Sequence, residues 1–241
     1  MCIIIVANKN KKIPNEHIKL ANELNCDGFG ISASVNDKLF VYKSISINSD
    51  DIINLYNSIR QVATGDIVLH FRLATHGDIS DKLCHPFYVN KDLVMFHNGI
   101  IRDSVSGYNG HNKNESDTKA FVNNVLKKFK KGFQNNETIM NMISTSVGEY
   151  NKLCFLDSTG QTTYTSSDKW VEYNGILYSN SEILYQGENY RYINPATMEY
   201  TTEDYYDYYD DYCDSEYNDE YMEYKDNIDY YKDYEELDAT F

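Results

Sequence analysis

The chain has 241 residues, enough for one sizeable core, and no run of 18 apolar residues, so we expect no transmembrane helix and no membrane partner. Its net charge of −15 is uneven: residues 201–241 carry 16 acidic and 2 basic side chains, whereas residues 1–200 carry 21 acidic and 20 basic ones. A nearly neutral body argues against nucleic-acid binding. Five widely spaced cysteines form neither a disulfide framework nor a CxxC pair, which fits a reducing cytoplasm.

The body mixes strand and helix patterns. In chain order we predict a strand at 2–8, a helix at 14–26, strands at 28–35 and 38–45, a helix at 49–61, strands at 66–74 and 93–96, helices at 116–129 and 136–143, and strands at 152–160, 162–166 and 175–181. The β-branched run at 2–8 suits a strand covered on both faces, and Asn36-Asp37 indicates a hairpin turn. Strand clusters separated by helix pairs predict an α+β fold rather than a parallel βαβ sheet.

The last segment differs in composition from the body. Tyrosine supplies 11 of the 41 residues at 201–241, and aliphatic residues are rare. Such a segment buries too little apolar surface to offset its ordering entropy, so we expect a domain at 2–200 and a disordered acidic, tyrosine-rich tail at 201–241. The tail suits docking to a basic groove on a partner; a solvated tail without a partner is the alternative.

Five short segments carry polar residues suited to catalysis. They are Met1-Cys2, HFRLATHG at 70–77, HPF at 85–87, HNGII at 97–101 and SDT at 116–118. Each has an ordinary explanation when taken alone: Cys2 as a small buried residue, Asn98-Gly99 as a type I′ hairpin turn, and Asp117 as an acid at a helix start. The histidines and cysteines between 70 and 97 match no common metal-ligand spacing, so we expect no metal site.

In this order the segments resemble the class II glutamine amidotransferases, N-terminal-nucleophile hydrolases that feed ammonia to biosynthetic enzymes. The turn Asp27-Gly28-Phe29-Gly30 adds to a resemblance that covers residues 2 to about 190. Leu83 and Lys119 depart from the family pattern without touching a proposed catalytic group. The resemblance implies a four-layer αββα sandwich, with two antiparallel sheets face to face and helices outside. It also implies a cysteine amidohydrolase that acts on glutamine and needs no cofactor.

The residue types fit the hydrolysis of an amide. Removal of Met1 would free the α-amine of Cys2, and an α-amino pKa near about 8 suits a general base for a thiol nucleophile. The side-chain amide of Asn98 and the backbone N–H of Gly99 can stabilise an oxyanion. We therefore expect Cys2, Asn98 and Gly99 to be the catalytic residues.

The expected substrate-binding residues match the charges of a free amino acid. Arg72 offers a planar fork for the α-carboxylate, and Asp117 offers a negative charge for the α-ammonium. By the resemblance, Thr75, His76 and Gly77 line the same pocket. The supporting residues around the site are expected to be His70, His85 and His97.

Two classes of function stay open. The first is an enzyme that releases ammonia from glutamine for a separate ammonia-accepting enzyme, because the tail is too small for an acceptor domain; hydrolysis of another γ-glutamyl-type amide belongs to the same class. The second is a non-catalytic binding or regulatory protein on the same fold. The presence of all five polar residues, namely Cys2, Arg72, Asn98, Gly99 and Asp117, favours the enzyme.

Overall fold

The structure, a computed structural model, describes residues 2–74, 77–108, 110, 114–166, 169–184, 192–193 and 200–201. All of these belong to one compact unit that spans residues 1–201. The predicted tail lies outside the described residues except for Thr201, so its disorder stays a prediction. Within the described part of the chain, no helix is both long and apolar enough to cross a membrane.

The N-terminal strand lies inside a six-stranded antiparallel sheet with the order β3-β2-β4-β1-β10-β9. The strands are β1 (Ile3–Asn8), β2 (Phe29–Val35), β3 (Lys38–Ser44), β4 (Thr64–Phe71), β9 (Val171–Tyr173) and β10 (Ile176–Tyr178). Because β1 pairs with β4 on one side and with β10 on the other, the backbone at the start of β1 is held from both sides.

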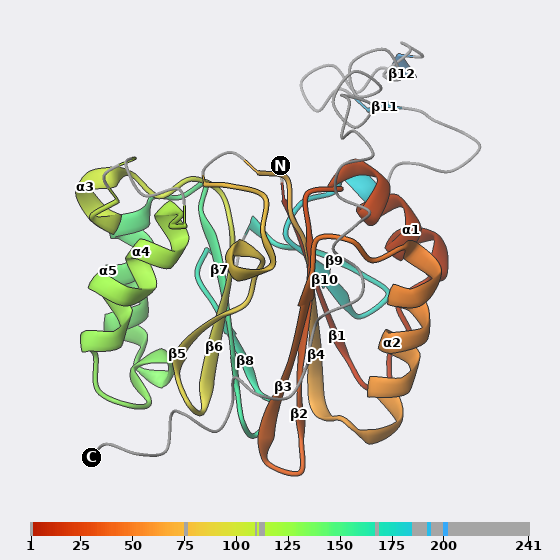
Figure 1. Cartoon of the computed structure of the whole chain (residues 1–241), viewed down its shortest axis with the longest axis horizontal. Helices are drawn as coiled ribbons and strands as arrows, with labels where there is room; N and C mark the ends of the chain where they lie inside the picture. Colours follow the sequence, from red (N-terminus) through yellow and green to blue (C-terminus); the bar gives the residue numbers. More distant parts are fainter. Residues whose placement is uncertain are drawn as a thin grey trace. The chain divides into compact units, whose positions relative to one another are not determined.

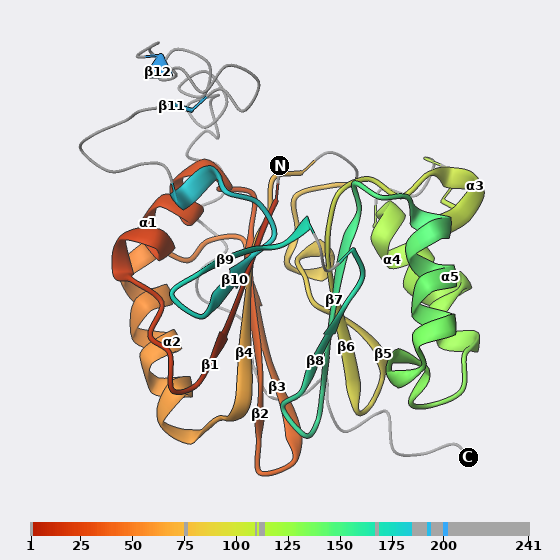
Figure 2. The ribbon, with the colours of Figure 1, turned by 180° about the vertical axis from the view of Figure 1, so that it is seen from behind.

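A second antiparallel sheet has the order β5-β6-β7-β8. Its strands are β5 (Phe87–Asn90), β6 (Leu93–Asn98), β7 (Lys152–Asp157) and β8 (Thr162–Tyr164). The two sheets lie face to face, as both opposite views show (Figures 1 and 2). A separate two-residue pairing joins β11 (Tyr192–Ile193) to β12 (Tyr200–Thr201).

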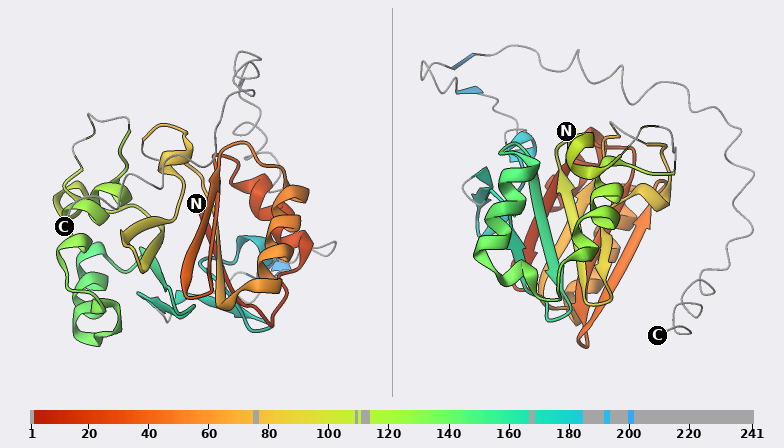
Figure 3. Two further views of the ribbon diagram at one scale, coloured as in Figure 1. Left: turned by 60° about the horizontal axis from the view of Figure 1, so that its bottom comes forward. Right: turned by 90° about the vertical axis from the view of Figure 1, so that its left-hand side faces the viewer.

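Helices cover the outer face of each large sheet. The first sheet carries α1 (Asn15–Leu24) and α2 (Ser49–Val62), and the second carries α3 (Asp103–Ser106), α4 (Asp117–Asn124) and α5 (Glu137–Val147). Figure 3 shows α4 and α5 in front of the second sheet. Short 3-10 turns lie at η1 (Asp81–Leu83), η2 (Leu126–Lys128), η3 (Phe133–Asn135) and η5 (Glu182–Leu184). The layers are therefore helix, sheet, sheet and helix.

The burial of β1 shows how these layers are held together. Ile3 and Ile5 belong to the hydrophobic cluster under α1 and α2, whereas Ile4 and Val6 belong to the cluster between the two sheets. Successive side chains of a strand point to opposite faces, so a strand covered on both sides must be apolar throughout. Each fully buried isoleucine contributes about 1.5–3 kcal/mol of transfer free energy. The β-branched run at the N-terminus thus anchors the residue that precedes it.

The predicted α+β class with antiparallel sheets is confirmed, and so is the Asn36-Asp37 turn, whose two residues have φ of 52° and 61°. Two predicted helix ends are wrong. The helix predicted over 116–129 ends at Asn124, because asparagine and the following valine are weak helix formers. The helix predicted over 136–143 continues to Val147 and ends at Gly148, whose φ of 94° lies in the region that favours glycine. Short strands β5 and β9 were not predicted.

Candidate active site

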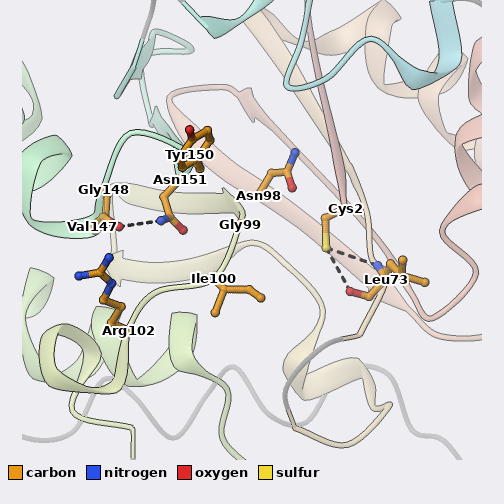
Figure 4. Close-up of a pocket in the computed structure, with 10 residues that line it drawn as sticks. All are labelled: Cys2, Leu73, Asn98, Gly99, Ile100, Arg102, Val147, Gly148, Tyr150 and Asn151. Atoms are coloured by element: carbon orange, nitrogen blue, oxygen red, sulfur yellow. Dashed lines mark hydrogen bonds between the residues drawn. The ribbon is translucent and has the colours of Figure 1, made fainter.

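Four strand ends meet at one cavity. Cys2 precedes β1, Leu73 follows β4, Asn98 ends β6 and Asn151 precedes β7. They line a cavity of about 340 Å³ together with Gly99, Ile100, Arg102, Val147, Gly148 and Tyr150 (Figure 4). Both sheets contribute to this cavity, because Cys2 and Leu73 come from the first sheet and Asn98 and Asn151 from the second.

The thiol of Cys2 is held by the backbone of Leu73. The N–H of Leu73 donates to Cys2 Sγ at 3.3 Å, and Sγ lies 3.4 Å from the Leu73 carbonyl oxygen, which can accept its proton. Asn180 Nδ2 donates to the Cys2 carbonyl at 3.0 Å and fixes its backbone. Burial raises the pKa of the Cys2 thiol, and the Leu73 hydrogen bond opposes this effect only in part. The thiol is therefore protonated near neutral pH, and its use as a nucleophile requires a base.

The side chain of Asn98 is tied to Ser179. Asn98 Nδ2 donates to Ser179 Oγ at 2.9 Å, and Ser179 Oγ also accepts the N–H of Ile4 at 2.9 Å. Asn98 Oδ1 is buried and has no hydrogen-bond partner among the described residues. A 180° turn of the amide would let the Ser179 hydroxyl donate to Oδ1 and would free Nδ2 as a donor. The turned orientation would leave Nδ2 unpaired in the position that Oδ1 now occupies, so the contact with Ser179 is compatible with either orientation of the amide.

Asn98 and Gly99 do not form the hairpin turn that the dipeptide suggests. Asn98 is the last residue of β6, Gly99 has a φ of 139°, and the next strand of that sheet, β7, begins only at Lys152. A type I′ turn needs positive φ at both residues, and Asn98 lacks it. Gly99 is required for a different reason: a Cβ there would overlap Asn151 Oδ1 and lie 3.0 Å from Asn151 Cγ. The glycine thus allows the backbone to approach Asn151.

Arg72 and Asp117 line a second cavity, which shares Cys2, Leu73 and Gly99 with the first. Arg72 is 4% exposed, and its Nη1 donates to the Asp78 carbonyl at 3.1 Å. Asp117 accepts the N–H of Ile101 at 2.7 Å and, through its other oxygen, the N–H of Thr118 at 2.7 Å. A cation and an anion therefore line one space beside the thiol. At about 20 Å³ this space has room for one water-sized molecule, so a bound amino acid requires the surrounding segments to move apart.

The three predicted supporting histidines form a buried group. The rings of His70 and His85 are 4.0 Å apart, and His70 Nε2 donates to the His97 carbonyl at 3.0 Å. His97 Nε2 donates to Asn151 Oδ1 at 2.8 Å, so the neutral ring accepts the Thr118 hydroxyl at Nδ1, 2.7 Å away. Burial lowers the pKa of all three histidines, in His70 to about 3. The group is therefore uncharged and positions its neighbours; His85 and His97 also line the second cavity.

Three predicted pocket residues are not placed at the two cavities. Thr75 and His76 lie outside the described residues. Gly77 is described but does not line either cavity; a Cβ there would lie 2.7 Å from Leu83 Cδ1 and 2.8 Å from the Glu115 carbonyl. Its close contacts indicate a packing role, with φ of 75° in the glycine-favoured region.

Sequence reasoning missed several residues that hold the site. Asn151 buttresses Gly99, and Ser179 and Asn180 hold Asn98 and the Cys2 carbonyl. Asp27 is a fourth such residue, and only it lies in a segment that the sequence pattern singled out, the DGxG turn. Its carboxylate accepts the N–H of Ala74 at 2.6 Å and so holds the segment after β4. The other three lie far along the chain from their partners and belong to no motif.

Comparisons with known proteins indicate one family. No family model matches the chain. The glutamine–fructose-6-phosphate aminotransferase of Buchnera aphidicola is 34% identical over 106 residues, which are 43% of this chain and 17% of that protein. The enzyme of the same name from Chlorobaculum tepidum is 37% identical over 67 residues, 27% of this chain and 11% of that protein. The chain thus spans less than a fifth of the length of these curated relatives.

A solved structure extends the comparison to the fold. The match to the glutamine phosphoribosylpyrophosphate amidotransferase of B. subtilis covers 76% of this protein and 43% of the B. subtilis chain. Its TM-score is 0.50, and the sequence identity is 13%. This match supports a shared fold of paired antiparallel sheets. The sequence relatives show homology to the class II glutamine amidotransferase domain over part of the chain, and the solved structure adds a similar fold.

Proposed function

We propose that the chain is an amidohydrolase that attacks the γ-amide of glutamine with Cys2. The observation that supports the proposal is that Cys2 and Gly99 line both cavities. One of these cavities is also lined by Asn98, and the other by Arg72 and Asp117. In this proposal Cys2 is the nucleophile, Asn98 and Gly99 are the oxyanion donors, and Arg72 and Asp117 bind the charges of the amino acid, an arrangement of the kind that a catalytic site requires.

In the proposed reaction the α-amine of Cys2, free after removal of Met1, takes the thiol proton. This base is needed because burial raises the pKa of the thiol and keeps it protonated. Sγ attacks the γ-carbonyl carbon to form a tetrahedral oxyanion. The carbon–nitrogen bond then breaks, the amine passes its proton to the departing ammonia, and a thioester remains. Water, deprotonated by the same amine, hydrolyses the thioester to glutamate.

The oxyanion would be stabilised by the N–H of Gly99 and the Nδ2 of Asn98. For Asn98 this requires the turned amide orientation, in which Ser179 donates to Oδ1 and Nδ2 is free. Arg72 and Asp117 would bind the α-carboxylate and the α-ammonium, so that the γ-amide is the only uncharged end of the substrate and points to Cys2. Positioning of this kind requires the charged cavity to open when glutamine enters.

The proposal is tested by labelling and by ammonia release. The purified protein should begin at Cys2 by mass spectrometry, and 6-diazo-5-oxo-norleucine should add once, at that residue. Cys2→Ala, which still permits removal of Met1, should abolish both labelling and ammonia release from glutamine. Cys26→Ala, a change at an exposed cysteine, is the matched control and should keep both. A Cys2→Ala protein that still releases ammonia would refute the mechanism.

Transfer of the ammonia to a separate enzyme docked on the acidic tail stays a prediction. The tail lies outside the described residues, apart from Thr201. Truncation at residue 201 should leave hydrolysis unchanged and abolish salt-sensitive binding of a basic partner. Loss of folding after truncation would contradict this division of the chain.

A further inference from the structure

Two unequal spaces meet at the Cys2 thiol. The smaller, of about 20 Å³, contains both charges that the proposed function assigns to the glutamyl group. The larger, of about 340 Å³, extends from Cys2 past Asn98 and Ile100 to Arg102 and Tyr150, as Figure 4 shows. If the glutamyl group binds on the charged side, the group attached to the γ-amide nitrogen faces the larger space.

The larger space far exceeds what ammonia requires. A molecule the size of water needs about 10–15 Å³ of such volume. The cavity of about 340 Å³ instead falls within the range of small-molecule sites. Its wall on the side away from Cys2 is formed by residues that are already hydrogen-bonded within the protein: Asn151 donates to the Val147 carbonyl at 2.6 Å and accepts from His97. The space is thus shaped by fixed residues.

The charge lining this space is positive. Among the described residues that line it, Arg102 is the one ionised side chain and none is acidic. No carboxylate among the described residues forms a salt bridge with Arg102. The C-terminal end of α5 at Val147 contributes a partial negative charge, but the Val147 and Gly148 carbonyls accept hydrogen bonds from Asn151, which weakens that effect. A full guanidinium charge at the far end of the space suits an anionic group.

We propose that this cavity binds the leaving amine of a γ-glutamyl amide whose amine carries a carboxylate, as in γ-glutamyl amino acids. The inference rests on the proposed function and names its substrate class. Sγ of Cys2 attacks the γ-carbonyl carbon, the carbon–nitrogen bond breaks, and the amino acid leaves with the proton taken from the thiol. Water then hydrolyses the thioester, so one γ-glutamyl amino acid and one water give glutamate and one free amino acid. Arg102 binds the carboxylate of the departing amino acid.

The first experiment measures binding, which does not depend on catalysis. Full-length Cys2→Ala protein is titrated calorimetrically with γ-glutamylalanine, with γ-glutamylalaninamide, which lacks only the carboxylate charge, and with glutamine. We expect γ-glutamylalanine to bind about tenfold more tightly than the other two, the usual size of one charge-assisted contact. Adding Arg102→Met should remove this preference, whereas adding Lys127→Met, a matched loss of one exposed positive charge, should keep it.

Two results would overturn the inference. One is equal binding of γ-glutamylalanine and its amide. The other is an equal loss of binding for glutamine and γ-glutamylalanine in the Arg102→Met protein, which would show that Arg102 binds the α-carboxylate instead. The unmutated protein is then assayed for release of alanine and ammonia. Selective binding without hydrolysis of either substrate would support the cavity assignment and refute the proposed function, so the two failures are distinct.

Discussion

Replacement of Gly99 by alanine tests whether the Gly99 N–H is an oxyanion donor that Asn151 holds in place. The φ of Gly99 is 139°, where a residue with a side chain is strained. The added Cβ would overlap Asn151 Oδ1 and lie 3.0 Å from Asn151 Cγ and 3.1 Å from its Cα. Asn151 cannot withdraw easily, because its Oδ1 accepts from His97 and its Nδ2 donates to the Val147 carbonyl.

The structure indicates how much folding stability and how much activity Gly99→Ala should lose. Backbone strain of this kind costs about 1–3 kcal/mol of folding stability, which lowers Tm by about 2–4 °C for each kcal/mol in a domain of this size. Contacts near 3.0 Å must also lengthen by several tenths of an ångström, which shifts the Gly99 N–H away from the oxyanion. Losing one such donor costs about 100- to 1000-fold in kcat. We expect Gly99→Ala to fold, to melt several degrees lower, and to lose about that much activity.

The assay is steady-state ammonia release from glutamine together with thermal unfolding. Gly132→Ala is the matched control: Gly132 has a φ of 85°, and nothing lies within 4 Å of its added Cβ. It should show a loss of Tm from backbone strain alone, with unchanged kcat. Folded Gly99→Ala protein with kcat within about threefold of the unmutated enzyme would refute the assignment of Gly99 as an oxyanion donor held by Asn151, since loss of such a donor costs far more.

Two further predictions concern residues around the site. Ser179→Ala removes the group that orients the Asn98 amide, so kcat for glutamine should fall about 100-fold with little change in KM. The control is Ser58→Ala on α2, whose exposed hydroxyl donates to the Asn54 carbonyl, and it should change neither constant. Equal rates for Ser179→Ala and the unmutated enzyme would contradict the role of Ser179 in orienting the Asn98 amide. The histidine group should make the fold sensitive to acid. Burial lowers the pKa of His70 to about 3 and also lowers that of His85 and His97, so below the unfolded value of about 6.5 the unfolded state binds more protons and stability falls as pH falls. Urea titrations should show a loss approaching about 1.4 kcal/mol per pH unit for each histidine, and His85→Phe should reduce the slope by about a third; an unchanged slope would mean that His85 is not buried in its neutral form.

Much of the fold follows from local patterns in the sequence. A β-branched run buried on both faces is readable in residues 3–6, and the Asn36-Asp37 turn depends only on the φ that two adjacent residues can adopt. Helices were located by apolar spacing, but their ends were misplaced where weak helix formers or a terminal glycine decide the last turn. The motif residues Arg72, Asn98 and Asp117 likewise stand out because each lies in a short recognisable segment.

The sequence alone therefore determined the class of fold, the family resemblance and the candidate residues between Cys2 and Asp117. Only the tertiary structure decided what holds them: Ser179 lies 81 residues from Asn98, and Asn180 lies 178 residues from Cys2. Such contacts depend on how β10 pairs with β1 and how the two sheets meet, and no local pattern specifies that pairing. The same holds for Asn98-Gly99, where the dipeptide favours a hairpin turn and the close approach of Asn151 decides otherwise. Local sequence selects residue types and conformations, whereas the site's geometry arises from pairings between distant segments.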